Sequence, residues 1–166
     1  MNDAAIDTLI AELAGPGVME RYVAWFELSF HPECGVLLTR DDSGWKGWWI
    51  ATLRVTRGDP VLGWLDPTTS REPLPLDDGA VQELARTIRT ALLAAPAKPT
   101  GIILDGCMFH LEFRSEGKQS ARSAHLNHRG EDLVRSLATD LCDLADAGAR
   151  WDATRSAFAS LRDYIG

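Results

Sequence analysis

The stretch IILDGCMFHLEFRSEGKQSARSAHLN, from Ile102 to Asn127, decides the fold that this sequence predicts. Apolar and polar residues alternate along it with the two-residue period of a β-strand, and Gly117-Lys118 interrupts the alternation. Glycine tolerates the positive φ at the first position of a type II′ turn, so a two-residue loop at Gly117-Lys118 predicts a β-hairpin. The stretch therefore indicates two antiparallel strands whose side chains can be assigned to faces.

The position of this loop also predicts which residues stand opposite each other. Phe109 then faces Leu126 and Leu111 faces Ala124 on the core side, so that apolar positions match across the two strands. On the other side we expect the pairs His110 with His125, Glu112 with Ser123, and Met108 with Asn127. Upstream, Asp105-Gly106 is either a second tight turn or a bulge in one long strand, and we favour the bulge because the arm before it is short.

Outside this hairpin, strands and helices occupy separate runs of the chain. Alternation predicts strands at 22–30, 36–39 and 45–56. Apolar stripes at helical spacing predict helices at 6–13, 81–92, 133–145 and 151–165, with Asp77 or Asp78 as the cap of the second. Residues 57–78 hold four prolines and are expected to form a long connection with one short strand at 61–65. The pattern predicts an α+β fold, in which a mainly antiparallel sheet of about five to seven strands packs with about four helices.

Length and composition predict one soluble domain over residues 1–166, with 45% hydrophobic and 25% charged residues. No apolar run approaches the roughly 20 residues of a membrane span, and the N-terminus lacks the basic region of a secretory signal. Cys34, Cys107 and Cys142 are odd in number and far apart, which is not the pattern of a disulfide framework. We therefore expect a cytoplasmic protein with no membrane association and no cofactor.

The net charge of −7 bears on the kind of partner. Binding to a phosphate backbone needs clustered Lys and Arg, and no such stripe is present, so nucleic acid is not expected. Complementary charge speeds association, which favours a basic protein as partner. The alternative is that the acidic residues only keep the protein soluble.

Six tryptophans are many for 166 residues, and several fall on predicted strands. Trp49 has the core-facing parity, whereas Trp25 and Trp48 belong to the opposite face. Either helices cover both faces of the sheet, or part of the second face meets a partner; an aromatic platform for sugar is a third option. We predict a partner-binding surface formed by tryptophans and loop acids, namely Trp48, Trp25, Trp45, Trp64, Asp41, Asp42, Asp59 and Asp66.

The polar face of the hairpin is the alternative site. His110 and His125, with Glu112 diagonal to them, have the side chains of an acid–base pair or a metal site. The competing interpretation is a sheet face of polar residues that point into solvent. The sequence does not supply a third metal ligand at a fixed spacing from these two histidines. Known catalytic signatures such as G-x-S-x-G, a Walker loop or H-E-x-x-H are absent from the sequence. Cys107 has core-facing parity and is expected to be a buried apolar residue.

The run LDGCMFHLEF (Leu104–Phe113), followed by a polar hairpin tip and a leucine-striped helix, resembles a module of small bacterial proteins. Several of these resemble immunity proteins, which neutralise toxins, and the resemblance covers residues 101–147. The module often carries a proline before its helix, where this chain has Asn127-His128-Arg129-Gly130. The resemblance implies an inhibitor that binds and neutralises a toxin, and the lack of a known catalytic signature fits that role. The alternatives are a small enzyme or metal-binding protein using the His110/His125 face, and a homodimer with a self-complementary apolar face.

Overall fold

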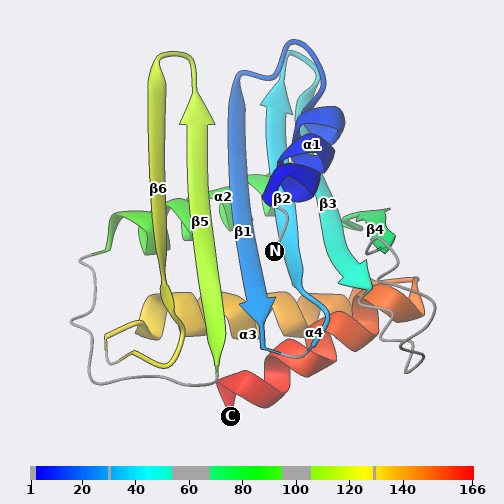
Figure 1. Cartoon of the computed structure of the whole chain (residues 1–166). Helices are drawn as coiled ribbons and strands as arrows, with labels where there is room; N and C mark the ends of the chain where they lie inside the picture. Colours follow the sequence, from blue (N-terminus) through cyan, green and yellow to red (C-terminus); the bar gives the residue numbers. More distant parts are fainter. Residues whose placement is uncertain (1–2, 30, 54–67, 95–105, 129) are drawn as a thin grey trace.

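The computed structural model describes residues 3–29, 31–53, 68–94, 106–128 and 130–166. Within these ranges the chain forms one six-stranded antiparallel sheet and four helices, which confirms the predicted α+β fold (Figure 1). The strands are β1 Glu20–Leu28, β2 Cys34–Asp41, β3 Gly44–Leu53, β4 Thr68–Pro73, β5 Cys107–Ser115 and β6 Lys118–His125. The helices are α1 Asp3–Ala14, α2 Asp78–Leu93, α3 Asp132–Gly148 and α4 Asp152–Ile165.

The strand order β4-β3-β2-β1-β5-β6 places β1 at the centre of the sheet. Strands β1 to β4 follow one another as a meander, and the β5–β6 hairpin pairs with the free side of β1. The strand β4 falls within the segment that the sequence predicts to be a connection. It ends at Pro73, and proline is tolerated there because β4 is an edge strand, where one row of backbone groups needs no partner. The short strand expected at 61–65 lies outside the described residues.

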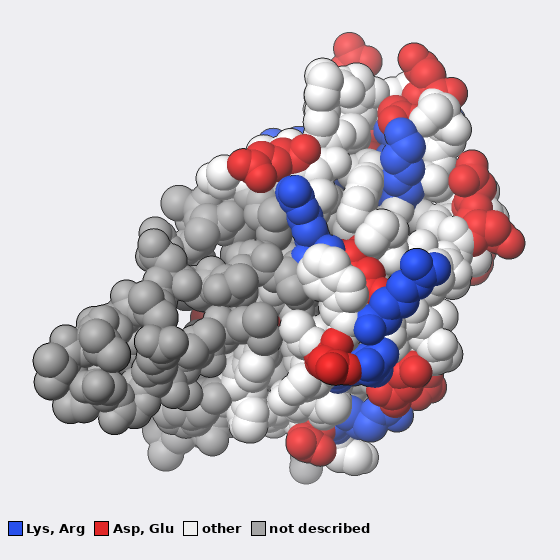
Figure 2. All heavy atoms as spheres, turned by 90° about the vertical axis from the view of Figure 1, so that its right-hand side faces the viewer, with Lys and Arg blue, Asp and Glu red and all other residues white. Residues whose placement is uncertain are grey.

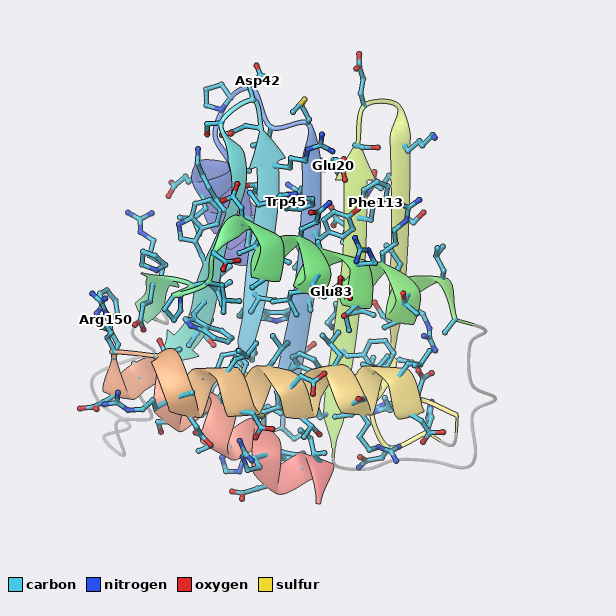
Figure 3. All side chains as sticks on the ribbon, turned by 180° about the vertical axis from the view of Figure 1, so that it is seen from behind. Glu20, Asp42, Trp45, Glu83, Phe113 and Arg150 are labelled. Carbon is cyan, nitrogen blue, oxygen red and sulfur yellow. The ribbon has the colours of Figure 1, made fainter. Side chains whose placement is uncertain are left out.

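One face of the sheet carries the main core, under α2, α3 and α4 (Figures 1 and 3). The predicted strand parity is confirmed here, because Tyr22, Phe26 and Trp49 all belong to this core. The Trp49 ring meets the Phe158 ring of α4 edge-on, with ring centroids 4.9 Å apart. All three cysteines are buried in the same core as free thiols, and burial raises the pKa of both Cys107 and Cys142 to about 12.

The opposite face carries a smaller core under α1, which lies in front of β2 and β3 in Figure 1. Ile10 is buried against four sheet residues, with the half-buried Leu13 beside it. The sheet residues of this second core are Val23, Trp25, Leu37 and Ile50, with Trp48 packed against them. Of the two alternatives for this apolar face, coverage by a helix is therefore the one that holds for β1 to β3.

The predicted register of the β5–β6 hairpin is wrong by two residues. Ser115 pairs with Lys118, so the loop is Glu116-Gly117, and Gly117 takes its positive φ of +68° at the second loop position. Phe109 consequently faces Ala124, His110 faces Ser123, Glu112 faces Ala121 and Met108 faces His125. A shift of two residues preserves the face of every side chain, so the predicted core face is still correct. Leu126 is fully buried just beyond β6, where its N–H donates to the Cys107 carbonyl at 2.8 Å.

Two buried carboxylates join the sheet to the helices. Glu72 of β4 accepts hydrogen bonds from the backbone N–H groups of Arg150 and Trp151, which lead into α4. Glu131, at the start of α3, receives the Arg122 guanidinium of β6 on both carboxylate oxygens, and the same guanidinium donates to the Ala91 carbonyl of α2 at 2.7 Å. These contacts fix where the helices sit along the strands.

Candidate functional site

Three aromatic side chains form a row across the helix-covered face of the sheet, where the strands extend beyond α2 (Figure 3). The Tyr22 ring lies between Trp45 and Phe113, with centroid distances of 5.9 and 4.8 Å. Tyr22 is buried, whereas Trp45 and Phe113 are half-buried and pack on the main core from its edge. We call these three residues the aromatic strip. It presents aromatic surface to solvent at its two ends, Trp45 on β3 and Phe113 on β5, while Tyr22 on β1 between them is buried.

The β2–β3 turn places Trp45 at one end of the aromatic strip. Gly44 has φ +118°, and a side chain on it would collide with the Asp78 carboxylate at the start of α2. The Trp45 N–H donates to the same carboxylate at 3.4 Å. The turn therefore rests on the N-terminus of α2, and Trp45 follows it on the helix side of the sheet.

Acidic residues gather at the Trp45 end of the aromatic strip. Asp77 caps α2 by accepting from the Ala80 N–H at 2.8 Å, as the sequence predicts, and Asp78 touches the β2–β3 turn that carries Asp41 and Asp42. Lys46 at 2.7 Å and the Ser43 hydroxyl and N–H lower the pKa of Asp41 to about 2. Asp42, Asp77 and Asp78 form no ion pair within the described part of the chain, so this end of the strip is acidic, and Asp77 and Asp78 face the positive N-terminus of α2.

Basic side chains and a hollow in the surface lie at the Phe113 end of the strip. The Arg89 guanidinium of α2 lies over the Phe113 ring, 5.5 Å from its centroid. Beside it is a hollow of about 380 Å³, lined in part by Lys118 and by Leu93, which is 67% exposed. The strip is therefore polarised, because its two ends carry charges of opposite sign.

The residues that the sequence predicts to bind a partner do not lie on one surface in the structure. Trp45, Asp41 and Asp42 lie at the aromatic strip or beside it. Trp25, by contrast, is only 4% exposed beneath α1, so the prediction that it contacts a partner is wrong. Trp48 is half-buried and packs against the same second core, so its predicted contact with a partner stays a prediction. The other predicted members lie outside the described residues, namely Trp64, Asp59 and Asp66.

The alternative polar site lies on the face that carries α1, over β1, β5 and β6. His110 Nε2 is 3.2 Å from Glu27 Oε2, and His110 Nδ1 is 2.8 Å from Ser123 Oγ. This arrangement is a carboxylate–imidazole–hydroxyl chain, in which the carboxylate orients the ring and the ring can exchange a proton with the hydroxyl. Sequence reasoning missed Glu27, because its approach to His110 depends on the pairing of β1 with β5.

His125 and Glu112 do not join this chain. His125 shares the face of His110 but stands opposite Met108, and its ring lies 5.3 Å from that of His128. Glu112 forms an ion pair with Arg21 of β1 instead. Within the described ranges, no group of three or more His, Cys, Asp and Glu side chains could hold a metal ion.

Comparison of this chain with protein-family models and with curated proteins found no match. Among the described helices, none combines the length and the apolar character needed to cross a membrane. The side of the molecule at the β4 edge shows Lys and Arg interspersed with Asp and Glu over its described part (Figure 2). The polarised aromatic strip thus contrasts with the mixed charge of this neighbouring face.

Proposed function

We propose that this chain is a protein-binding protein that holds a basic partner on the aromatic strip. The observation that carries the proposal is the row of three aromatic rings, in which Trp45 and Phe113 are half-buried, with carboxylates at one end that form no ion pair among the described residues. Aromatic residues dominate binding energy at protein interfaces, and surrounding charges mainly set the rate of association. Trp45 and Phe113 would supply the affinity, and Asp42 and Asp78 would attract a basic segment to the Trp45 end.

A more specific form of the proposal is that the partner is a toxin which this chain neutralises as an immunity-type inhibitor. The support is the sequence resemblance over residues 101–147, a stretch that includes Phe113 of the aromatic strip. An immunity gene is expected beside its toxin gene, so the product of the neighbouring gene is the partner to test. Co-expression should relieve the growth arrest that this product causes alone, and growth arrest that persists would contradict the immunity role.

The binding test uses surface plasmon resonance with the product of the neighbouring gene. Trp45→Ala should raise the dissociation rate, at a cost of about 2 kcal/mol or more in binding free energy if Trp45 is a hot spot. Trp151→Ala is the matched control, because Trp151 is 50% exposed at the start of α4, away from the strip. Unchanged dissociation from the Trp45 variant, or an equal effect in the control, would contradict the proposal.

A second test removes charge at the acidic end of the strip, which should affect the association rate rather than the dissociation rate. Neutralising Asp42 and Asp78 to Asn should slow association and flatten its dependence on salt concentration, because steering by charge is screened. The control is a double change to Asn at Asp140 and Asp163, two exposed acids of α3 and α4, which alters the net charge equally. Association that is insensitive to salt would mean that the acids serve solubility alone. Sedimentation at several concentrations separates binding of this partner from pairing of two copies of the chain.

Trp48→Ala tests the reassignment of that tryptophan from the partner surface to the second core. The expected result is a fall of about 2 kcal/mol in the free energy of unfolding, less than for a fully buried tryptophan because Trp48 is half-buried. Binding by the folded fraction should be unchanged. Urea unfolding measures the first quantity, and a variant with normal stability and weakened binding would return Trp48 to the partner surface.

A second candidate function is acid–base catalysis of ester hydrolysis by the Glu27–His110–Ser123 chain. In such a reaction Ser123 Oγ transfers its proton to His110 and attacks the ester carbonyl. The departing alcohol takes that proton, and water then releases the acyl group from Ser123. Activity on p-nitrophenyl acetate that is lost in Ser123→Ala and retained in Ser160→Ala would support this function. Equal activity in the two variants would exclude it.

A further inference from the structure

A cleft of about 830 Å³ opens at the end of the sheet, between the α1–β1 connection and the tip of the β5–β6 hairpin. Residues of α1 and of the C-terminal end of β5 line the cleft, and Lys118 at the start of β6 lines both this cleft and the hollow beside Phe113. The apolar side of the cleft comprises Ala11, Ala14, Val18 and Met19. Met19 is 40% exposed and is one of four exposed large apolar side chains among the described residues.

The polar side of the cleft is rich in cations. Four basic side chains line it, together with only two carboxylates, although the chain as a whole has a net charge of −7. The cations are Arg21, Arg40, Arg114 and Lys118. The carboxylates are Glu20 and Glu116. Basic residues concentrated in one cleft of an acidic protein focus a local positive potential there.

The ion pairs of the cleft leave part of this positive charge available. Arg40 is paired with Glu20 at 2.7 Å, and Arg21 is held by Glu112 from outside the cleft. Arg114 has only a long contact of 3.8 Å with the same Glu112, and it is 53% exposed. Lys118 has no carboxylate partner among the described residues. Of the four cations in the cleft, Arg114 and Lys118 are the least engaged by carboxylates of the described residues, so they are the ones available to an incoming anion.

The Arg21–Glu112 pair keeps the floor of the cleft fixed. The Arg21 side chain is 15% exposed, and its buried Nε has no hydrogen-bond partner in the described ranges. Glu112 neutralises the charge of Arg21 and the Nε atom is buried, so Arg21 is a paired residue of the cleft lining. The cleft therefore combines a paired arginine, the more loosely held cations Arg114 and Lys118, and an apolar wall.

We propose that this cleft binds a small organic anion with an apolar part. Its carboxylate or phosphate contacts Arg114 and Lys118, and its apolar part lies against Met19 and Ala14. Both anionic groups satisfy the same cations, so the chemical class is an amphiphilic anion rather than a particular molecule. This site goes beyond the partner-binding function proposed above, because it contains none of Trp45, Tyr22 and Phe113, although Lys118 lines both the cleft and the hollow at the Phe113 end of the strip.

Isothermal titration calorimetry of the intact chain tests the proposal with four probes: octanoate, octyl phosphate, octanol and inorganic phosphate. We expect the two amphiphilic anions to bind, with an affinity that falls as salt is added. Whichever of the two binds more tightly identifies the anionic group that the cleft prefers. Octanol lacks the charge and inorganic phosphate lacks the apolar part, so both should bind at least ten-fold more weakly.

Paired substitutions locate the site. Replacing Arg114 and Lys118 by Gln should weaken binding of the amphiphilic anions at least ten-fold. The control replaces Arg86 and Arg150 by Gln, which changes the net charge equally at exposed positions outside the cleft. Met19→Ser should weaken both anions and leave inorganic phosphate unaffected. If the double change impairs folding, as judged by circular dichroism, Lys118→Gln alone is expected to give a smaller loss in the same direction.

Several results would overturn the proposal. Absence of binding by both amphiphilic anions would reject the site, and equal binding by the cleft variant and the control variant would place it elsewhere. Octanol binding as tightly as octanoate would remove the role of the cations. Inorganic phosphate binding as tightly as octyl phosphate would remove the role of the apolar wall. None of these results affects the test at Trp45, so failure of one proposal is distinguishable from failure of the other.

Discussion

Glu131 shows at the scale of one residue how a buried charge depends on its partner. Its side chain is 1% exposed, and the Arg122 guanidinium contacts both of its oxygens while lying over the Phe109 ring. Removing one member of such a pair leaves the other charge buried without compensation, which costs far more than the intact pair contributes. We therefore expect the loss of one partner to lower the free energy of unfolding strongly, even if the intact pair contributes little to it.

The corresponding prediction is that Glu131→Ala lowers the free energy of unfolding by about 3–5 kcal/mol. The double change Arg122→Met with Glu131→Leu should recover most of the loss, because neither charge remains. Asp152→Ala is the control, since Asp152 pairs with Arg155 but is 97% exposed, and a loss below about 1 kcal/mol is expected there. Urea unfolding measures all three. Equal losses at Glu131 and Asp152 would show that the buried pair has no special role.

At the scale of an element, the β5–β6 hairpin depends on the loop position of Gly117. Its φ of +68° is strained for any residue with a Cβ, so Gly117→Ala should lower the free energy of unfolding by about 1 kcal/mol. Gly79→Ala is the matched control in the first turn of α2, where φ is negative and helix propensity favours alanine by up to about 1 kcal/mol. Thermal unfolding should therefore move in opposite directions for the two variants. Movement in the same direction would contradict the assigned loop.

In the same hairpin, the sequence predicts the face of each side chain correctly but not the pairing register. Alternation predicted the faces of Phe109 and His110 correctly, since parity follows from the backbone alone. The register depends on whether Gly117 occupies the first or second loop position, and both positions accept glycine. The strand β4 was missed because TTSREP contains a proline and lacks apolar alternation, so only its pairing with β3 makes it a strand.

The contacts that form the candidate sites could not be predicted from the sequence, because they depend on the order of the strands in the sheet. Glu27 meets His110, and Tyr22 meets Phe113, only because β5 pairs with β1 across a long stretch of chain. Strand order is a property of the whole sheet and is not contained in any local pattern. The sequence proposed both Trp25 and Trp45 for the partner surface, yet Trp25 is buried in the second core beneath α1, whereas Trp45 is half-buried at the edge of the main core.

At the scale of the whole molecule, the three thiols report on the integrity of the main core. Burial raises the pKa of Cys34, Cys107 and Cys142, so the thiolate form is suppressed in the folded protein. We expect the native protein to react negligibly with Ellman's reagent at pH 8 and to release three equivalents of thiol when denatured. A disulfide, or rapid reaction of the native protein, would contradict this picture of the core.

The same thiols give the stability a dependence on alkaline pH. Their folded pKa values lie above the unfolded value of about 8.5, so the unfolded chain loses its thiol protons first as pH rises. Their contribution is complete below about pH 8.5 and declines as pH rises toward about 12. Urea unfolding at pH 8 and pH 10 should show a lower free energy of unfolding at pH 10. Replacing all three cysteines by alanine should remove that part of the difference, even though the variant is less stable at both pH values.

The central position of β1 has a consequence for synthesis on the ribosome. Its pairing with β2 can form early, whereas its other edge waits until Cys107–Ser115 has emerged. During that interval the nascent chain presents the edge of a strand that contains Val23, Trp25 and Phe26, all of which the finished fold buries. Unpaired apolar edges promote association between chains. Slower translation of residues 29–106 should therefore increase aggregation of the newly made protein, and chaperones that hold unfolded chains should reduce it.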